Sequence, residues 1–231
     1  MSKVVCRVIK LVIVNSLTII RLVGSLMLPF IYYKYGASFS ALFTIILFLT
    51  DAFDGFLART LKVQTFFGSI IDASSDKLLN IISLIILGLE YNVMFAPIII
   101  EIAILYTMYS TYRYGGNIQA SKIGKIKTII LDVFVVLSFV VLSLPAINIY
   151  KLYDYNEVII SIFSLIILVS CIYALYDYLL KNKKARENPK CKTIKLTKKK
   201  RKSFDLIKKQ LFDTNYYLKH KDESIIKQFY I

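Results

Sequence analysis

The sequence predicts an all-α integral membrane protein with six transmembrane helices and a short interfacial helix at its N-terminus. Of the 231 residues, 57% are hydrophobic and the mean hydropathy is +0.61, which is well above that of soluble globular domains. Apolar runs long enough to cross a bilayer follow one another as far as Leu180. Lys and Arg residues gather between these runs and after them. The two patterns together are typical of a protein with several membrane spans.

Each expected helix follows from its local pattern. The first residues place Lys3, Arg7 and Lys10 among Val, Ile and Leu, which predicts an amphipathic interfacial helix over residues 1–14. The spans that follow are runs of about 20 residues, the length that crosses a hydrocarbon core of about 30 Å. They are expected at Ser16–Tyr35, Ser38–Arg59, Phe67–Leu89, Val93–Tyr112, Ile126–Ile149 and Val158–Leu180.

The composition changes after the last span. Of the 30 Lys and Arg residues, 17 lie from Lys181 onward. This segment is expected to be disordered or to lie on anionic lipid, and no nucleic-acid-binding motif accompanies its charge. A short amphipathic helix is expected within it, over Ser203–Phe212. The chain is therefore divided into the interfacial segment 1–14, a six-helix membrane domain 15–182 and a basic cytoplasmic tail 183–231.

The Lys and Arg residues of the short loops predict the orientation, because loops rich in these residues stay in the cytoplasm. Basic residues cluster at the N-terminal end, after the second span, after the fourth span and in the tail. The opposite loops hold only Lys34 and Lys151, beside acidic residues. Both termini are predicted to face the cytoplasm. The first apolar stretch has no small-residue cleavage site, so no cleavable signal peptide is expected.

Cysteine and histidine usage excludes two kinds of protein. Cys6, Cys171 and Cys191 show no pairing pattern, so a disulfide framework is not expected. The one histidine, His220, lies in the polar tail. Catalysis that depends on a histidine base or nucleophile is therefore not expected.

Four aspartates interrupt this apolar chain over a short stretch. A carboxylate inside a membrane span costs about 3 kcal/mol on insertion scales, so such residues are functional candidates. Asp51 and Asp54 lie three residues apart and share one helix face with Gly55, while Asp72 and Asp76 lie four apart on the next span. Both pairs lie roughly 8 to 14 Å from the cytoplasmic ends of their spans. Such a set of oxygens suits a hard divalent cation such as Mg²⁺.

Two other roles of the aspartates compete with metal binding. Interhelical salt bridges are disfavoured because the basic residues close in sequence, Arg59, Lys62 and Lys77, are too few for four acids. A divalent-cation transporter would continue its polar groups toward the outer side of the membrane. The outer halves of the second and third spans are apolar, and no internal repeat is evident. The transporter is kept as a distant alternative to an enzyme.

The spacing of these residues resembles the signature of the CDP-alcohol phosphatidyltransferases. The resemblance covers about residues 10 to 180 and implies six membrane helices, usually in a homodimer. "VNSLTIIR", which contains Asn15, is similar to the family's N-terminal motif, with Val14 where a proline is frequent. The signature positions read Asp51-x2-Asp54-Gly55-x2-Ala58-Arg59-x8-Gly68-x3-Asp72-x3-Asp76.

The resemblance implies a phosphatidyl transfer at two Mg²⁺ or Mn²⁺ ions. Asp51, Asp54 and Asp72 would hold one ion, Asp51, Asp72 and Asp76 the second, and Asp76 would be the general base. CDP-diacylglycerol is the implied donor, CMP the implied leaving group, and membrane lipids surround the site. The positions that the resemblance assigns to the nucleotide are Asn15, Gly55, Ala58, Arg59, Thr65 and Gly68.

The acceptor alcohol is predicted to be glycerol 3-phosphate. "ASKIGKIKT" (120–128) resembles a segment of the phosphatidylglycerophosphate synthases, and Glu101 aligns with a glutamate of that branch. Lys125 and Lys127 suit an anionic acceptor, and Arg113 is the further candidate. Ile100 and Met108 stand where that branch has arginines. Phosphatidylglycerol, as in cardiolipin synthases, and an inositol phosphate therefore stay as alternative acceptors.

Two more acids lie inside expected spans. Glu101 and Asp132 are expected to pair with Arg21 or Arg113, or to line the polar cavity.

Overall fold

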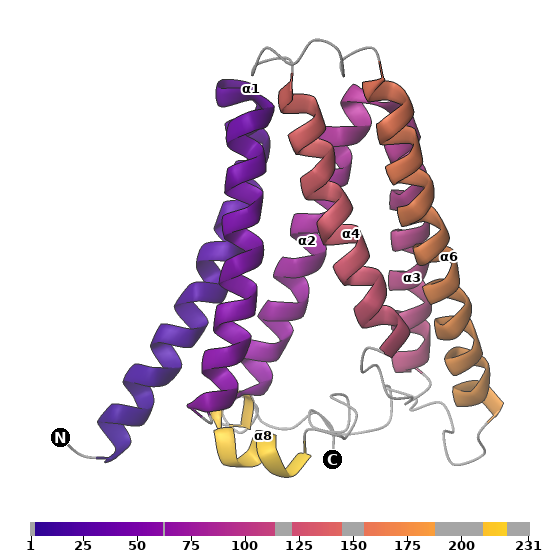
Figure 1. Ribbon diagram of the computed structural model, residues 1–231. Coiled ribbons are helices and arrows are strands. Elements are labelled where there is room, and N and C mark those ends of the chain that lie inside the picture. The colour runs from indigo at the N-terminus through magenta and orange to yellow at the C-terminus, as the bar shows by residue number, and fades with distance from the viewer. Residues whose placement is uncertain (1–2, 62, 114–121, 145–154, 188–209, 221–231) are drawn as a thin grey trace.

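The computed structural model describes residues 3–61, 63–113, 122–144, 155–187 and 210–220, and these form helices and connecting turns without any strand. Figure 1 shows a bundle of long helices, with the short helix α8 across one end of it. The elements are α1 (Lys3–Thr60), α2 (Phe66–Glu90), the 3₁₀ turn η1 (Asn92–Met94), α3 (Phe95–Arg113), α4 (Lys122–Ser143), α6 (Asn156–Glu187) and α8 (Thr214–His220).

Helix α1 turns back on itself at Gly36. This residue has φ 79° and ψ −175°, a combination that in practice only glycine adopts, and it interrupts the helical backbone. The two arms of α1 run side by side in opposite directions (Figure 1). A Cβ built on Gly24 would lie 2.7 Å from a methyl group of Leu47, so the arms approach closely at this glycine. The result is a helical hairpin that joins residues far apart in sequence.

Four stretches of the described chain are long and apolar enough to cross a membrane: Val14–Ala58, Asn92–Thr111, Lys122–Ser143 and Asn156–Glu187. The first of them contains both arms of α1. Helix α2 is not among the four, and it carries Asp72, Asp76 and Lys77 in its interior. The all-α fold class is therefore confirmed, while the number of spans stays a prediction.

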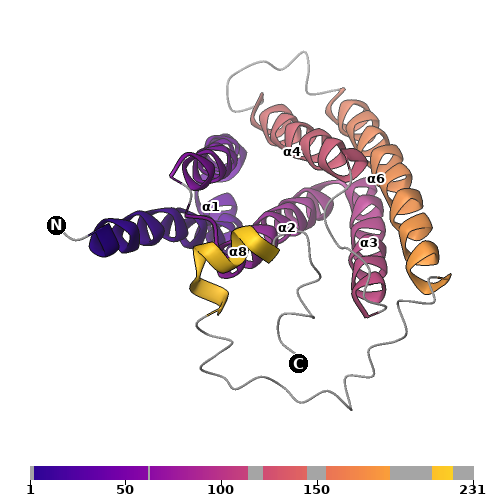
Figure 2. The ribbon, with the colours of Figure 1, turned by 90° about the horizontal axis from the view of Figure 1, so that it is seen from below.

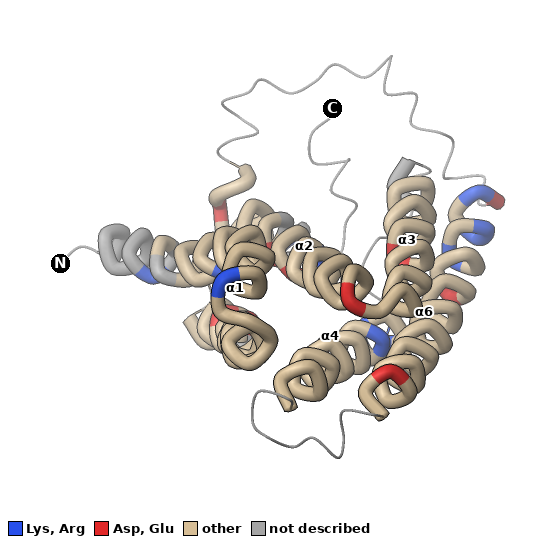
Figure 3. The backbone as a smooth tube through the Cα atoms, turned by 90° about the horizontal axis from the view of Figure 1, so that it is seen from above, with Lys and Arg blue, Asp and Glu red and all other residues tan. Residues whose placement is uncertain are grey.

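The helices bury an apolar core and leave apolar residues on the outside. Leu79, Leu87, Phe139 and Ile167 are fully buried where the helices meet. Large apolar side chains such as Leu165 are more than half exposed on the outer surface. Most positions along the helices are neither acidic nor basic (Figure 3). An apolar exterior around a packed core is what a protein surrounded by lipid requires.

Several helix bounds differ from those expected. Helix α1 begins at Lys3 and continues without a break at residue 14, so a separate interfacial segment 1–14 stays a prediction. Helix α4 begins at Lys122, a full turn before the expected start of the fifth span, and residues 145–149 lie outside the described chain. Helix α6 continues past Leu180 to Glu187. Its last turn contains Lys184 and Arg186, and a helix of such polar residues can extend beyond the apolar span.

The described part of the tail is folded against the bundle. Helix α8 lies across the ends of α1 and α2 (Figure 2). Phe212 packs on Phe67 with ring centroids 4.7 Å apart. The amphipathic helix expected over Ser203–Phe212 falls mostly on residues outside the described chain. Its described residues, 210–212, are helical, and α8 follows after Asp213.

Candidate active site

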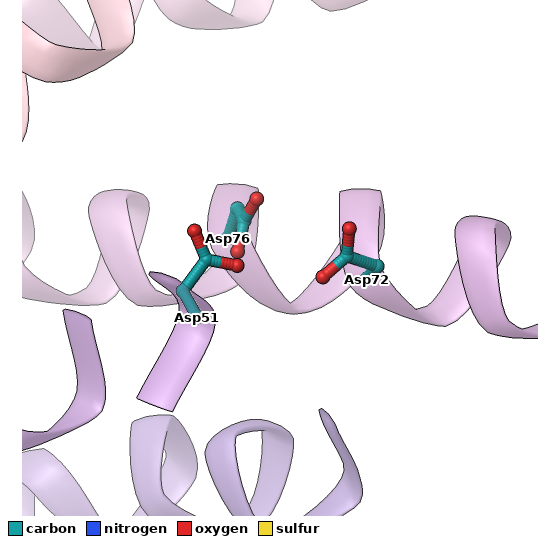
Figure 4. Close-up of side chains that lie close together, drawn as sticks. All are labelled: Asp51, Asp72 and Asp76. Atoms are coloured by element: carbon teal, nitrogen blue, oxygen red, sulfur yellow. The ribbon is translucent and has the colours of Figure 1, made fainter. Parts of the chain in front are cut away.

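The carboxylates of three aspartates converge between α1 and α2. Asp51 reaches from α1 toward Asp72 and Asp76, which lie on successive turns of α2 (Figure 4). One oxygen of each carboxylate lies within 4.8 Å of the corresponding oxygens of the other two. The spacing of four residues in α2 puts its two aspartates on one face, and the hairpin of α1 brings the third to meet them. We refer to Asp51, Asp72 and Asp76 as the carboxylate group.

Arg21 is the counter-ion of this group. Its guanidinium is fully buried and pairs with Asp51, with Asp54 at 3.3 Å, with Asp72 at 2.5 Å and with Asp76 at 3.0 Å. A planar guanidinium with five N–H donors can bridge several carboxylates, which a lysine could not do with the same geometry. Arg21 thereby offsets part of the negative charge that the four aspartates concentrate between the helices.

Two further contacts hold Arg21 and Asp54 in place. The Nε of Arg21 donates to the Ser75 hydroxyl at 3.0 Å. The Thr18 hydroxyl donates to Asp54 at 3.1 Å. Asp54 is 3% exposed, whereas Asp51 and Asp72 are 42% and 43% exposed. The carboxylate group is therefore accessible from one side, and the buried Asp54 lies beside the group.

The carboxylate group fits a divalent metal ion. Carboxylate oxygens are the ligands that Mg²⁺ and Mn²⁺ prefer, and three of them converge here within the reach of one ion. Asp54, the fourth aspartate expected to bind metal, lies beside the group but faces Thr18 and Arg21.

A cavity of about 180 Å³ adjoins the carboxylate group. Asp54 and Asp72 form part of its lining, so the cavity and the group share Asp72. Of the six positions expected to bind the nucleotide, five line the cavity, and the side chain of the sixth, Arg59, lies outside the described atoms. The lining residues are Val14, Asn15, Thr18, Asp54, Gly55, Ala58, Val63, Gln64, Thr65, Gly68, Ser69, Asp72 and Tyr217.

The start of α2 forms one wall of this cavity. Thr65 caps the helix, and its hydroxyl accepts a hydrogen bond from the Gly68 amide at 3.1 Å. A Cβ built on Gly68 would lie 3.1 Å from Asn15 Oδ1 and 3.2 Å from Thr65 Oγ1. A side chain at this position would therefore require the Asn15 amide or the Thr65 hydroxyl to shift by a few tenths of an ångström.

The residues expected to bind the acceptor do not all lie together. Lys127 is buried and forms an ion pair with Glu101 of α3, to which the Cys171 thiol also donates at 3.5 Å. Lys125, two residues earlier on α4, is exposed. The side chain of Arg113 lies outside the described atoms.

Glu101 forms an ion pair, as expected, but its partner is Lys127 and not Arg21. Glu101 pairs with Lys127, and Arg21 pairs with the four aspartates instead. The reason is that α4 packs so that Lys127 faces α3, while Arg21 on α1 faces α2.

Two further charged residues lie near the carboxylate group and the Glu101–Lys127 pair. Lys77, next to Asp76 on α2, interacts electrostatically with Asp76, Glu101 and Lys127. Asp132 of α4 interacts with Asn80 of α2 and with Asp76.

Sequence reasoning expected Arg21 to pair with Glu101 or Asp132 and disfavoured salt bridges of the four aspartates, so it missed their pairing with Arg21. The signal for Arg21 was present, because a lone arginine in an apolar span requires a buried anionic partner.

Comparisons with known proteins add to this geometry. A family model described as CDP-alcohol phosphatidyltransferase matches residues 11–176. The chain is similar to a CDP-diacylglycerol–glycerol-3-phosphate 3-phosphatidyltransferase of Wigglesworthia glossinidia brevipalpis, with 34% identity over 131 residues, which cover 52% of this chain and 71% of that protein. Proteins of the same name from Salmonella choleraesuis and Salmonella typhimurium are 31% identical over 129 residues, covering 49% of this chain and 70% of each of them. No solved structure matches the chain.

Proposed function

Since the chain belongs to the CDP-alcohol phosphatidyltransferase family, we propose that it transfers the phosphatidyl group of CDP-diacylglycerol to glycerol 3-phosphate. The products are phosphatidylglycerophosphate and CMP. The acceptor is taken from the relatives, whose names specify glycerol 3-phosphate. The distant alternative, a divalent-cation transporter, is not supported, because the family is one of transferases.

The observation that carries this proposal is the position of Asp72. It belongs to the carboxylate group and also lines the cavity that contains Asn15, Thr65 and Gly68. A nucleotide held in the cavity would extend its pyrophosphate toward Asp72. The bond to be broken would then lie beside the carboxylates.

The same proposal includes two metal ions. Asp51, Asp72 and Asp76 would hold one Mg²⁺ or Mn²⁺, and a second ion would be shared by Asp51, Asp54 and Asp72. When bound, such ions offset the pyrophosphate charge and stabilise the phosphate of the leaving CMP. Asn15, Gly55, Ala58, Arg59, Thr65 and Gly68 are the residues proposed to bind the nucleotide.

Asp76 is proposed as the general base. It takes the proton from the acceptor hydroxyl, and the hydroxyl oxygen forms a bond to the lipid-side phosphorus. The bond between this phosphorus and the bridging oxygen breaks, and CMP leaves with that oxygen. Asp76 suits the task because its side chain is 34% exposed on the open side of the group, where an acceptor can approach.

Lys127 is proposed to hold the phosphate of the acceptor, with Lys125 and Arg113 as outer residues. Lys77, next to Asp76 on α2, adds a further positive charge near Lys127 and the proposed base. A doubly charged acceptor needs such charge, because the aspartates repel it.

The membrane arrangement extends the same proposal. The two arms of α1, followed by α2, α3, α4 and α6, would form six spans within the domain 15–182, after the interfacial segment 1–14. Both termini and the basic tail 183–231 would lie in the cytoplasm, where CDP-linked substrates are made. A homodimer is the proposed assembly.

CMP release tests the function directly. The purified full chain in detergent micelles is incubated with CDP-diacylglycerol, Mg²⁺ and one of three acceptors: glycerol 3-phosphate, phosphatidylglycerol or an inositol phosphate. We expect that CMP and phosphatidylglycerophosphate form when glycerol 3-phosphate is the acceptor, and that the other two acceptors give no CMP. If CMP is released with one of the other acceptors and not with glycerol 3-phosphate, the assignment of the acceptor is wrong, while the family assignment is unaffected.

A further inference from the structure

One residue of the cavity lies outside the region that matches the family. Tyr217 lines the cavity together with residues of α1 and the start of α2, yet it follows the family region 11–176 by about forty residues. The tail was expected to lie free or on lipid, so its contribution to this cavity was not foreseen.

Helix α8 is held in place by aromatic contacts. Phe66, which is 4% exposed, packs edge-on against Tyr217 with ring centroids 4.9 Å apart and against Tyr216 at 6.2 Å. Phe67 packs against Phe212 at 4.7 Å. Three aromatic pairs therefore join the tail to the first turn of α2, beside the cap Thr65.

The start of α8 determines which tyrosine enters the cavity. The Asp213 carboxylate accepts hydrogen bonds from the amides of Asn215 at 2.9 Å and of Tyr216 at 3.4 Å, as a helix cap does. The Tyr217 amide donates to the Asp213 carbonyl at 3.0 Å. Tyr217 lines the cavity. Tyr216 contacts Phe66 but is not among the residues that line the cavity.

The two ends of the cavity differ in chemistry. Tyr217 packs on Phe66 at the start of α2, and Asp72 lies six residues further along the same helix, about 9 Å away by the helical rise. This is roughly the length of a nucleoside. The aromatic end suits a flat base, since base–aromatic stacking is a general means of holding nucleobases, and the carboxylate end suits a metal-bound pyrophosphate.

We infer that Tyr217 binds the donor nucleotide, so that α8 of the tail supplies the wall of the cavity against which the cytosine ring packs. This inference rests on the proposed function and adds to it a residue from outside the family region. Tyr217 acts through its ring and is not a catalytic residue. Loss of the ring therefore weakens nucleotide binding and leaves the chemical step unchanged.

CMP binding to the full chain tests the inference. Titration calorimetry with CMP and Mg²⁺ in detergent micelles compares the wild type with Tyr217→Ala, Tyr217→Phe and the matched control Tyr216→Ala. We expect Tyr217→Ala to bind CMP about tenfold more weakly, a loss of about 1.4 kcal/mol. Tyr217→Phe and Tyr216→Ala should stay within about twofold of the wild type, because the ring at the cavity is kept.

Kinetics and hydrogen exchange separate the possible failures. The KM for CDP-diacylglycerol should rise in Tyr217→Ala, with the KM for glycerol 3-phosphate and kcat unchanged. CMP should slow amide exchange over residues 212–220 in the wild type. Equal CMP affinity in Tyr217→Ala and the wild type, equal losses in Tyr217→Ala and Tyr216→Ala, or tighter binding in Tyr217→Ala would overturn the inference. A wild-type chain that neither binds CMP nor releases it would overturn the proposed function itself.

Discussion

At the scale of single residues, the site depends on charges that balance one another inside an apolar bundle. Arg21 pairs with Asp51, Asp54, Asp72 and Asp76 at once. A metal ion in the carboxylate group would bring positive charge to the same oxygens. Arg21 and the ion would both reduce the repulsion among the aspartates. When one of them is absent, the stability of the protein should depend more strongly on the other.

Arg21→Gln removes this counter-ion, and the first prediction concerns stability. In EDTA we expect the variant to be less stable than the wild type by about 3 kcal/mol, since breaking a buried ion pair leaves an uncompensated charge. Mg²⁺ should restore more stability to Arg21→Gln than to the wild type. Thermal unfolding followed by circular dichroism, with and without Mg²⁺, measures both effects. Equal unfolding temperatures in EDTA would contradict this view of Arg21.

Asp76→Asn tests the proposed base. We expect CMP release to fall to background, because the amide cannot take the acceptor's proton, while CDP-diacylglycerol binding persists through the remaining ligands. Asp177→Asn is the matched control, since Asp177 pairs with Lys181 on α6, away from the carboxylate group. Substantial turnover in Asp76→Asn would exclude Asp76 as the base.

Lys125 and Lys127 should have unequal effects on the acceptor. They diverge on α4, with Lys127 buried beside Glu101 and Lys125 exposed. Lys127→Ala should raise the KM for glycerol 3-phosphate about tenfold or more, and Lys125→Ala about twofold at most, with the donor KM unchanged. Initial-rate measurements of CMP release give these values.

A double variant controls for the charge left behind by Lys127→Ala. In Glu101→Gln/Lys127→Met no buried carboxylate is left without a partner. Any gain in stability over Lys127→Ala therefore comes from removing the charge of Glu101. If this double variant also recovers the wild-type KM for glycerol 3-phosphate, Lys127 does not bind the acceptor.

At the scale of elements, the hairpin of α1 is what assembles the site. Thr18 on the first arm meets Asp54 on the second, and Arg21 meets Asp51. Both contacts need the chain to reverse at Gly36, and a continuous helix would hold these residues far apart.

Gly36→Ala tests the reversal. Its positive φ is strained for any residue with a Cβ, and no atom lies within 4 Å of the added Cβ, so the effect should come from the backbone alone. We expect a loss of stability of about 1 to 3 kcal/mol. Ala37→Ser, at the neighbouring position, should change stability little. Thermal unfolding that is the same for Gly36→Ala and the wild type would show that the turn does not need this backbone conformation.

At the scale of the whole molecule, the arrangement in the membrane decides which substrates reach the carboxylate group. The described part of the tail lies at the same end of the bundle as the N-terminus (Figure 1). Tyr217 of α8 lines the cavity at this end, so we expect the cavity to lie at the cytoplasmic side that is predicted for both termini.

Reporter fusions test this orientation. A reporter fused after Leu180 should be active only as a cytoplasmic reporter, and one inserted near Asn92, in the turn between α2 and α3, only as an external one. The reverse pattern would place the carboxylate group on the side without CDP-linked substrates.

The long helices of the bundle, and the residues that share a face on each of them, could be predicted from the amino-acid sequence. Long apolar runs have to be helical in a bilayer, because every backbone amide must be bonded within its own segment. The helical period puts Asp72 and Asp76 on one face, and the same period separates Lys125 from Lys127. Such local relations need no knowledge of neighbouring segments.

The pairing of helix faces could not be predicted from the amino-acid sequence. The contacts of Arg21 with the aspartates, of Lys127 with Glu101 and of Tyr217 with Phe66 join residues from about 25 to 150 positions apart in sequence. Hydrophobic periodicity shows that a face is buried, but many faces are equally apolar, and the periodicity does not specify the partner of each. The partner is set by the packing of all the described helices together, including that of α8 against the start of α2.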